Sequence, residues 1–163
     1  MKKAIILTIA ALIIVIYASN MTYQQQTIVP ELRTLLKDKP LEDVLSSVEI
    51  PYWGTIISIE SRGYFYFIEF LIRKATHFIG YGMLAVIFYF LFLKLKWRVP
   101  NVLAFVTIFI IACLDEYRQS RIPGRTGIFD DVLIDATGAI FFLLVVNVIM
   151  AIKRIITKKA ELS

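Results

Sequence analysis

The chain has 163 residues, of which 58% are hydrophobic and 19% charged, and its mean hydropathy is +0.72. Soluble domains are about 45–50% apolar, and the excess found here comes in continuous blocks instead of along one helical face, so it indicates an integral membrane protein. The net charge of +5 does not indicate a nucleic-acid-binding protein, because the basic residues lie at the ends of the apolar blocks and form no single patch.

The first apolar block covers residues 4–21 and follows Lys2 and Lys3. A basic start and an apolar middle are typical of a secretory signal peptide as well as of a membrane anchor. No A-x-A cleavage pattern follows the block, so we expect a retained first transmembrane helix, with a cleaved signal as the alternative.

Residues 22–63 are polar by comparison and hold six acids and four bases. Pro30 and Pro40 each suit the first turn of a short helix, and apolar residues at i, i+3, i+4 and i+7 over 41–48 predict an amphipathic helix. Two aromatic residues that suit the headgroup level of a bilayer come next: Tyr52 and Trp53. We therefore expect an amphipathic extracellular loop that lies on the bilayer.

Three further transmembrane helices are predicted over residues 64–94, 100–117 and 131–152. An external turn at 118–130 separates the last two, where the sequence IPGRTG interrupts helical structure. The predicted fold class is an all-α integral membrane protein with four transmembrane helices, and the whole chain forms one domain.

The basic residues predict the orientation of these helices. When the N-terminus, the 94–98 corner and the C-terminus are placed on one side, that side carries nine Lys and Arg and one acid. The 22–63 loop has a net charge of −2. The positive-inside rule therefore places both termini in the cytoplasm and the loop outside.

Charged residues in three of the predicted helices fall at one depth. Each helix can be measured from the basic residue at its cytoplasmic end, at ~1.5 Å per residue. On this scale Lys74 lies roughly 30 Å, Asp115 roughly 26 Å and Asp135 roughly 27 Å from that end. The hydrocarbon core is ~30 Å thick, so all three lie just inside its outer boundary.

Ionisable groups at membrane depth are costly, so they are expected to face one another inside the bundle. Their spacing within each helix, three or four residues, places them on one helical face. The external turn can fold back and carry Arg121 and Arg125 toward them. We expect a polar ring made of Lys74, His77, Asp115, Gln119, Arg125, Asp131 and Asp135.

Three stretches of the sequence share a further pattern: RKATHFIGYGMLAV, LDEYRQSRIPGR and DDVLIDATGA. They contain K-x-x-H-x-x-x-Y, then D-E-x-x-Q with a Pro-Gly-Arg turn, then D-x-x-x-[ND]-x-x-G. In this pattern, which covers about residues 67–139, the chain resembles the VanZ-like family of bacterial multi-pass membrane proteins; many members have Asn where Asp135 stands. The resemblance implies location in a bacterial cell membrane and a link to reduced susceptibility to glycopeptide antibiotics, teicoplanin in particular.

The polar residues have structural as well as functional interpretations. His77 has three possible roles: a buried imidazole hydrogen-bonded to Asp115 or Asp131, a catalytic acid or base, or a metal ligand. Two nearby cations, Lys74 and Arg125, disfavour the metal role. Lys74 and Arg125 neutralise carboxylates, hold a lipid phosphate, or do both. We predict no metal and no cofactor, with catalytic candidates His77, Asp115 and Asp131 and substrate-binding candidates Lys74, Tyr81, Glu116, Gln119, Arg125 and Asp135.

Two functions agree with these features. The first is a protein that binds a lipid-linked or anionic headgroup at the outer leaflet. The second is an intramembrane hydrolase or transferase that acts on a lipid-linked cell-envelope substrate through His77 and the aspartates. A transporter is disfavoured, because the four helices contain no symmetric pair of broken segments. The expected partners are membrane lipids and a lipid-linked cell-wall precursor, and not nucleic acid.

Overall fold

A computed structural model describes residues 1–161, and four long helices dominate it. They are α1 (Lys2–Ser19), α6 (Tyr64–Lys94), α7 (Pro100–Gln119) and α8 (Phe129–Glu161). Each is long and apolar enough to cross a membrane. The prediction of four apolar spans in a mostly helical protein is therefore confirmed.

The ends of these helices follow local sequence. Gly63, at a φ of +79°, precedes α6, and Pro100 occupies the first turn of α7, where its missing N–H costs nothing. Helix α8 continues past the predicted end at Ile152 to Glu161. The Lys, Arg and Ala residues there are good helix formers, so the end of an apolar block is not the end of a helix.

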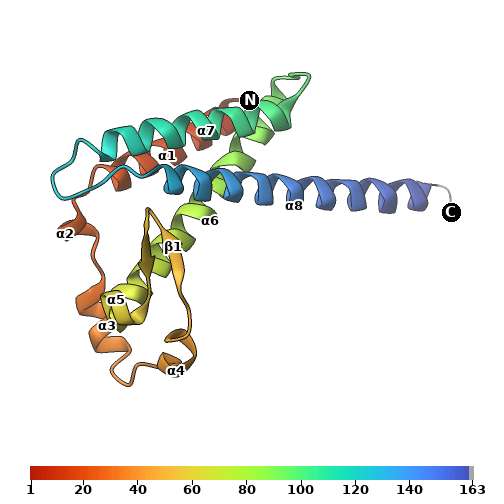
Figure 1. The fold of residues 1–163 in the computed structure, drawn as a ribbon. Coiled ribbons are helices and arrows are strands. Elements are labelled where there is room, and N and C mark those ends of the chain that lie inside the picture. Colours follow the sequence, from red (N-terminus) through yellow and green to blue (C-terminus); the bar gives the residue numbers. More distant parts are fainter. Residues whose placement is uncertain (162–163) are drawn as a thin grey trace.

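Two of the long helices run opposite to the other two (Figure 1). Helices α6 and α8 run from the end of the bundle that carries the polar loop, whereas α1 and α7 run toward it. At the opposite end, Asn101 of α7 and Asn147 of α8 exchange side-chain hydrogen bonds of 3.2 and 2.9 Å. The bundle is therefore tied by polar contacts at both ends, with an apolar centre between them.

The core is built where α6, α7 and α8 meet. Leu84, Ile108 and Val132, one from each helix, are almost fully buried there. Close approach of α6 and α8 depends on glycine, because a Cβ at Gly138 would overlap the carbonyl oxygen of Phe78. In contrast, α1 leaves most of its apolar side chains exposed, as a helix that faces lipid would.

Residues 20–63 fold into a separate lobe of short elements beside the start of α6 (Figure 1). Pro30 lies in the first turn of its helix, as predicted. The lobe contains α2 (Tyr23–Gln26), α3 (Val29–Leu35), α4 (Glu42–Leu45), β1 (Ile50–Tyr52), β2 (Thr55–Ile57) and α5 (Ile59–Arg62).

The prediction of an amphipathic helix over 41–48 is wrong. Only α4 is helical, Pro40 lies outside it, and Leu41 precedes it in the left-handed region at a φ of 63°. Ser46 and Ser47 donate to the carbonyls of residues three positions earlier, at 2.8 Å each, and such bonds compete with a further helical turn. The chain then enters a hairpin instead.

The hairpin pairs Ile50 with Ile57 and Tyr52 with Thr55. Its two-residue turn, Trp53 and Gly54, has positive φ at both positions, 48° and 72°, which is the geometry that matches the twist of paired strands. This turn places Tyr52 and Trp53 against the first turn of α8, where the polar site begins.

Candidate functional site

One polar cluster joins the hairpin to two of the long helices. Lys74 of α6 forms an ion pair with Asp131 of α8 and donates to the Tyr52 hydroxyl at 2.6 Å. Tyr52 in turn donates to the same oxygen of Asp131 at 2.6 Å. The ammonium also lies 4.4 Å from the centre of the Tyr52 ring, a cation–π distance. Asp131 therefore has a cation and a neutral donor on one oxygen.

A second contact holds the hairpin on α8. The backbone N–H of Trp53 donates to Asp130 at 2.8 Å. Asp130 and Asp131 occupy the first turn of α8, where carboxylates are stabilised by the exposed backbone N–H groups of the helix. The two contacts fix the hairpin tip above the site.

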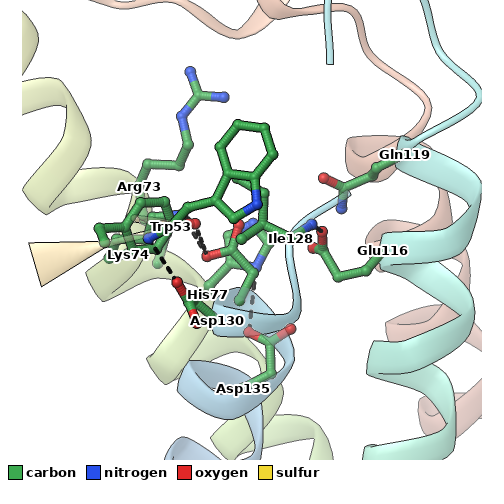
Figure 2. A network of polar contacts seen from close by, with 12 residues as sticks. Trp53, Arg73, Lys74, His77, Glu116, Gln119, Ile128, Asp130 and Asp135 are labelled. Carbon is green, nitrogen blue, oxygen red and sulfur yellow. Dashed lines mark hydrogen bonds and ion pairs between the residues drawn. The ribbon is translucent and has the colours of Figure 1, made fainter. Parts of the chain in front are cut away.

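His77 of α6 and Asp135 of α8 form the next contact along the same pair of helices (Figure 2). The Nδ1 atom of His77 lies 3.2 Å from Oδ1 of Asp135. When the carboxylate is ionised it only accepts, so Nδ1 then carries the proton, and in a neutral ring Nε2 is left as an acceptor. Asp135 is 0% exposed, and its second oxygen has no hydrogen-bond partner within residues 1–161. His77 also stacks on Tyr81, with ring centres 5.9 Å apart.

Helix α7 contributes a third group of contacts. Asp115 accepts from Arg118 at 2.8 Å and from Gln119 at 2.6 Å. Arg125, on the connection after α7, donates to the Gln119 side-chain oxygen at 2.5 Å and to the Met21 carbonyl at 3.1 Å. The Gln119 side chain thus bridges the Asp115 carboxylate and the Arg125 guanidinium through two hydrogen bonds.

Two buried glutamates hold the chain segments around the site. Glu116 accepts from the Ile128 N–H at 2.9 Å, which fixes the connection between α7 and α8. Glu69 accepts from the Tyr23 hydroxyl and from the Ile28 N–H, both at 2.9 Å, and lies 3.6 Å from Arg73. Both glutamates therefore position backbone that borders the site.

Electrostatics outside the spanning helices agree with this geometry. Burial, and then the hydrogen bond to Asp131, raise the pKa of Tyr52 above its usual value, so the hydroxyl stays protonated as a donor. Burial, and then the positive charge of Arg73, lower the pKa of Arg125. The second effect is the one expected of two guanidinium groups within electrostatic range of each other.

Two cavities border the polar residues. One, of about 560 Å³, extends from the apolar side chains Ile14 and Val15 of α1 to the charged residues of α6 and α7. The other, of about 210 Å³, lies under the hairpin. His77, Tyr81 and Asp115 line the larger cavity, and Tyr52, Trp53, Lys74 and Asp131 line the smaller one. Four residues line both: Glu69, Arg73, Gln119 and Arg125.

The structure brings the residues of the predicted ring to one end of the bundle but pairs them differently. The partner of His77 is Asp135, not Asp115 or Asp131, because α8 presents successive turns to successive turns of α6. Arg121 does not join them: it is exposed and donates to the Tyr117 hydroxyl at 2.7 Å. The roles assigned to the candidate residues stay predictions.

Several site residues were missed or undervalued in the sequence. Arg118, three residues after Asp115, and Arg73, four after Glu69, have the spacing of ion pairs on one helical face and could have been found from it. Tyr52 is 79 residues from Asp131, and no local spacing signals that contact.

Among residues 1–161, no three His, Cys, Asp or Glu side chains are grouped so that they could hold a metal ion.

Comparison with known proteins gives one finding. The family model described as VanZ/LLP1 matches residues 4–150, which include all four long helices in whole or in large part and the entire polar site. No curated protein matches the chain, and no solved structure does.

Proposed function

Because the chain belongs to the VanZ/LLP1 family of multi-pass membrane proteins, we propose that its charged site binds a lipid-linked or anionic headgroup at the outer leaflet. Occupation of that headgroup would make it less accessible to an antibiotic that acts at the same surface. The proposal thus includes reduced susceptibility to glycopeptides, with teicoplanin as the example that the family resemblance suggests.

The larger cavity carries this proposal. Its volume of about 560 Å³ lies within the ~300–1,000 Å³ of small-molecule sites. One part of its wall is apolar, with Ile14, Val15 and Ile72, and another part holds ionisable side chains such as Arg73 and His77. A cavity with one apolar and one charged end has the polarity of a lipid, with a hydrocarbon chain and a polar head.

Support for an outward-facing site comes from the charge distribution. The polar lobe and the site lie at one end of the bundle, and the N-terminus and the 94–98 corner lie at the other (Figure 1). The latter end carries the excess of Lys and Arg, and such residues favour the cytoplasmic side. We therefore place the site in the outer leaflet.

The test is headgroup-dependent binding by the purified full chain. Vesicle lipids and a cell-wall precursor extract are incubated with the protein, and co-purifying lipids are identified by mass spectrometry. We expect enrichment of one anionic headgroup class, and loss of both the enrichment and teicoplanin protection in Arg125→Ala. Equal recovery of all lipids, together with unchanged susceptibility in Arg125→Ala, would refute the proposal.

A second function is favoured by the His77–Asp135 pair on the wall of the same cavity. Such a pair can orient an imidazole whose free nitrogen takes a proton from an attacking hydroxyl, as in a hydrolase or transferase acting on a lipid-linked substrate. Arg125 could then stabilise the phosphate charge that develops.

His77→Gln distinguishes the two functions. A binding protein keeps its lipid and its protective effect in this variant, provided that the melting temperature in detergent is unchanged. An enzyme keeps the bound lipid but loses turnover, seen as the disappearance of a modified envelope lipid when cells expressing the variant are compared with cells expressing the original chain. His77→Ala should give the same result as His77→Gln. Because the two variants leave side chains of different volume, agreement between them separates a loss of chemistry from a change in packing.

A further inference from the structure

The wall between the two cavities has an excess of positive charge. Of its four residues, Arg73 and Arg125 are cationic, Glu69 is anionic and Gln119 is neutral, so the wall carries 2 − 1 = +1. Glu69 already accepts from Tyr23 and from a backbone N–H. Counted over these four residues alone, the shared wall has a deficit of one negative charge.

Arg125 is the centre of this deficit. Within residues 1–161 its guanidinium forms no ion pair, and it donates only to the neutral oxygens of Gln119 and Met21. Burial, and then the charge of Arg73, lower its pKa, and the charges of Glu116, Asp115 and Asp131 offset this effect only in part. An anion bound at this point would relieve the repulsion.

Arg73 is able to share such an anion. Its guanidinium lies 3.6 Å from Glu69, 3.3 Å from the Gln26 side-chain oxygen and 5.0 Å from the Tyr23 ring centre. Figure 2 shows the Arg73 side chain extending away from Lys74 and His77. The side chain is thus directed away from the Lys74–Asp131 ion pair, whose charges already compensate each other.

The cavities on either side differ in polarity. The larger one has Ile14, Val15, Ala18 and Ile72 on its wall and suits a hydrocarbon chain. The smaller one, of about 210 Å³, has hydroxyl groups from Tyr52, Thr55 and Thr126 among its lining residues and suits a small polar group. Between the two lies the guanidinium pair, and guanidinium groups match phosphate oxygens in geometry and charge.

We infer that the ligand is a phosphodiester lipid, with its phosphate between Arg73 and Arg125, its hydrocarbon chain in the cavity beside α1, and a small hydroxylated headgroup in the cavity under the β-hairpin. This inference rests on the proposed binding of an anionic headgroup and specifies its chemistry. Lys74, which the sequence suggested for the phosphate, instead anchors Asp131.

The experiment measures the binding of phosphatidylglycerol, the chosen probe, to the full chain in detergent by native mass spectrometry. Phosphatidylcholine and diacylglycerol with the same acyl chains are the comparison lipids, and glycerol 3-phosphate is the chain-free comparison. We expect phosphatidylglycerol to bind most tightly, and Arg73→Gln and Arg125→Gln each to weaken it by about tenfold or more, the loss of one charge-assisted contact. Glycerol 3-phosphate should bind more weakly than the lipid because it leaves the apolar cavity empty.

Two variants make the result specific. Arg121→Gln removes an exposed guanidinium from the same connection and should leave phosphatidylglycerol binding unchanged. Ala18→Trp fills the apolar cavity and should weaken binding of the lipid but not of glycerol 3-phosphate. Because Ala18 lies on α1, this variant tests the inference even where an arginine variant does not fold.

The possible failures are distinguishable. Preferential binding of phosphatidylglycerol that Lys74→Met abolishes, but that neither arginine variant changes, would overturn the inference and leave the proposed function intact. Equal affinity for lipid and glycerol 3-phosphate would overturn the assignment of the chain cavity. Binding of all three lipids with one affinity would overturn the inference together with the proposed function.

Discussion

Single residues in this protein are stabilised by particular partners, and the Lys74–Asp131–Tyr52 cluster shows why. An ammonium or a carboxylate in a poorly solvated place is costly unless it is paired and hydrogen-bonded. Here the lysine meets one carboxylate oxygen and one phenol, and the phenol meets the same carboxylate. Each group contacts both others, so we expect removal of one partner to lower the free energy of unfolding more than removal of the whole charged pair.

Asp131→Leu should therefore be more destabilising alone than together with Lys74→Met. The single variant leaves the lysine with Tyr52 and no anion, at a cost on the order of 3–5 kcal/mol, whereas the double variant leaves no charge to compensate. Thermal unfolding in detergent measures both. A double variant that is less stable than Asp131→Leu would contradict the dependence of the two groups on each other.

Tyr52 predicts a pH effect with a defined sign. Burial and the Asp131 hydrogen bond raise its pKa in the folded protein above the ordinary value of about 10, so above this pH the unfolded chain loses a proton that the folded chain keeps. Stability from this group is complete below about pH 10 and falls as pH rises further.

In Tyr52→Phe this alkaline decline should be smaller, since no phenol titrates, while stability at neutral pH falls by about 1 kcal/mol for the lost hydrogen bond. Unfolding in detergent from pH 7 to the alkaline limit of the protein would show it. Tyr66→Phe, at a half-exposed ring of α6 that borders the same cavity, is the matched control. Identical alkaline slopes for Tyr52→Phe and the original chain would contradict the prediction.

At the scale of elements, the crossing of α6 and α8 sets the geometry of the site. The two helices run in the same direction, so Lys74 meets Asp131 and His77 meets Asp135 one turn further along. Further into the bundle, Gly138 packs against the backbone of α6 at Phe78. A larger distance between the helices at this glycine would separate the pairs above it.

Gly138→Ala should thus destabilise the protein and disturb the site, because a Cβ there meets backbone, which cannot move aside as a flexible side chain can. Overpacking of this kind costs about 1–3 kcal/mol. Gly80→Ala, on α6, is the control: nothing lies within 4 Å of its Cβ, and alanine favours the helix by about 0.5–1 kcal/mol. Melting temperatures that move in the same direction for both variants would count against this account of the crossing.

At the scale of the whole molecule, four helices of alternating direction return the chain to the side on which it starts. The polar lobe and the connection after α7 then share one end of the bundle, and both contribute to the site. The positive-inside rule relates this arrangement to the membrane and predicts that the site end faces outward.

Cysteine labelling tests this orientation. Cys113 is the one cysteine of the chain, so Cys113→Ala provides a background without thiols. In that background we expect Asp38→Cys, in the polar lobe, to react with a membrane-impermeant maleimide in intact cells, and Lys158→Cys, near the end of α8, to react only after the cells are opened. The reverse pattern would invert the topology and place the site in the inner leaflet.

Hydropathy along the chain is sufficient to locate the four helices, and helix geometry predicts that their polar residues lie at similar depth. Hydrophobic length is summed along the chain, and the rise of a helix converts residue number into distance, so neither depends on distant residues. The same holds for contacts within a helix turn, as between Asp115 and Arg118. The hairpin was missed because its strands have only three residues each, too few to show alternation.

Partner choice, by contrast, arises from packing. Whether His77 meets Asp115, Asp131 or Asp135 depends on the rotation and spacing of α6, α7 and α8, which close packing at glycines determines and spacing within one helix does not. Tyr52 reaches Asp131 across 79 residues because a two-residue turn aims the hairpin at α8. Arg73 and Arg125 likewise line a shared wall only because folding brings α6 and the connection after α7 together. Residues 52 positions apart in the chain come close only in the folded protein.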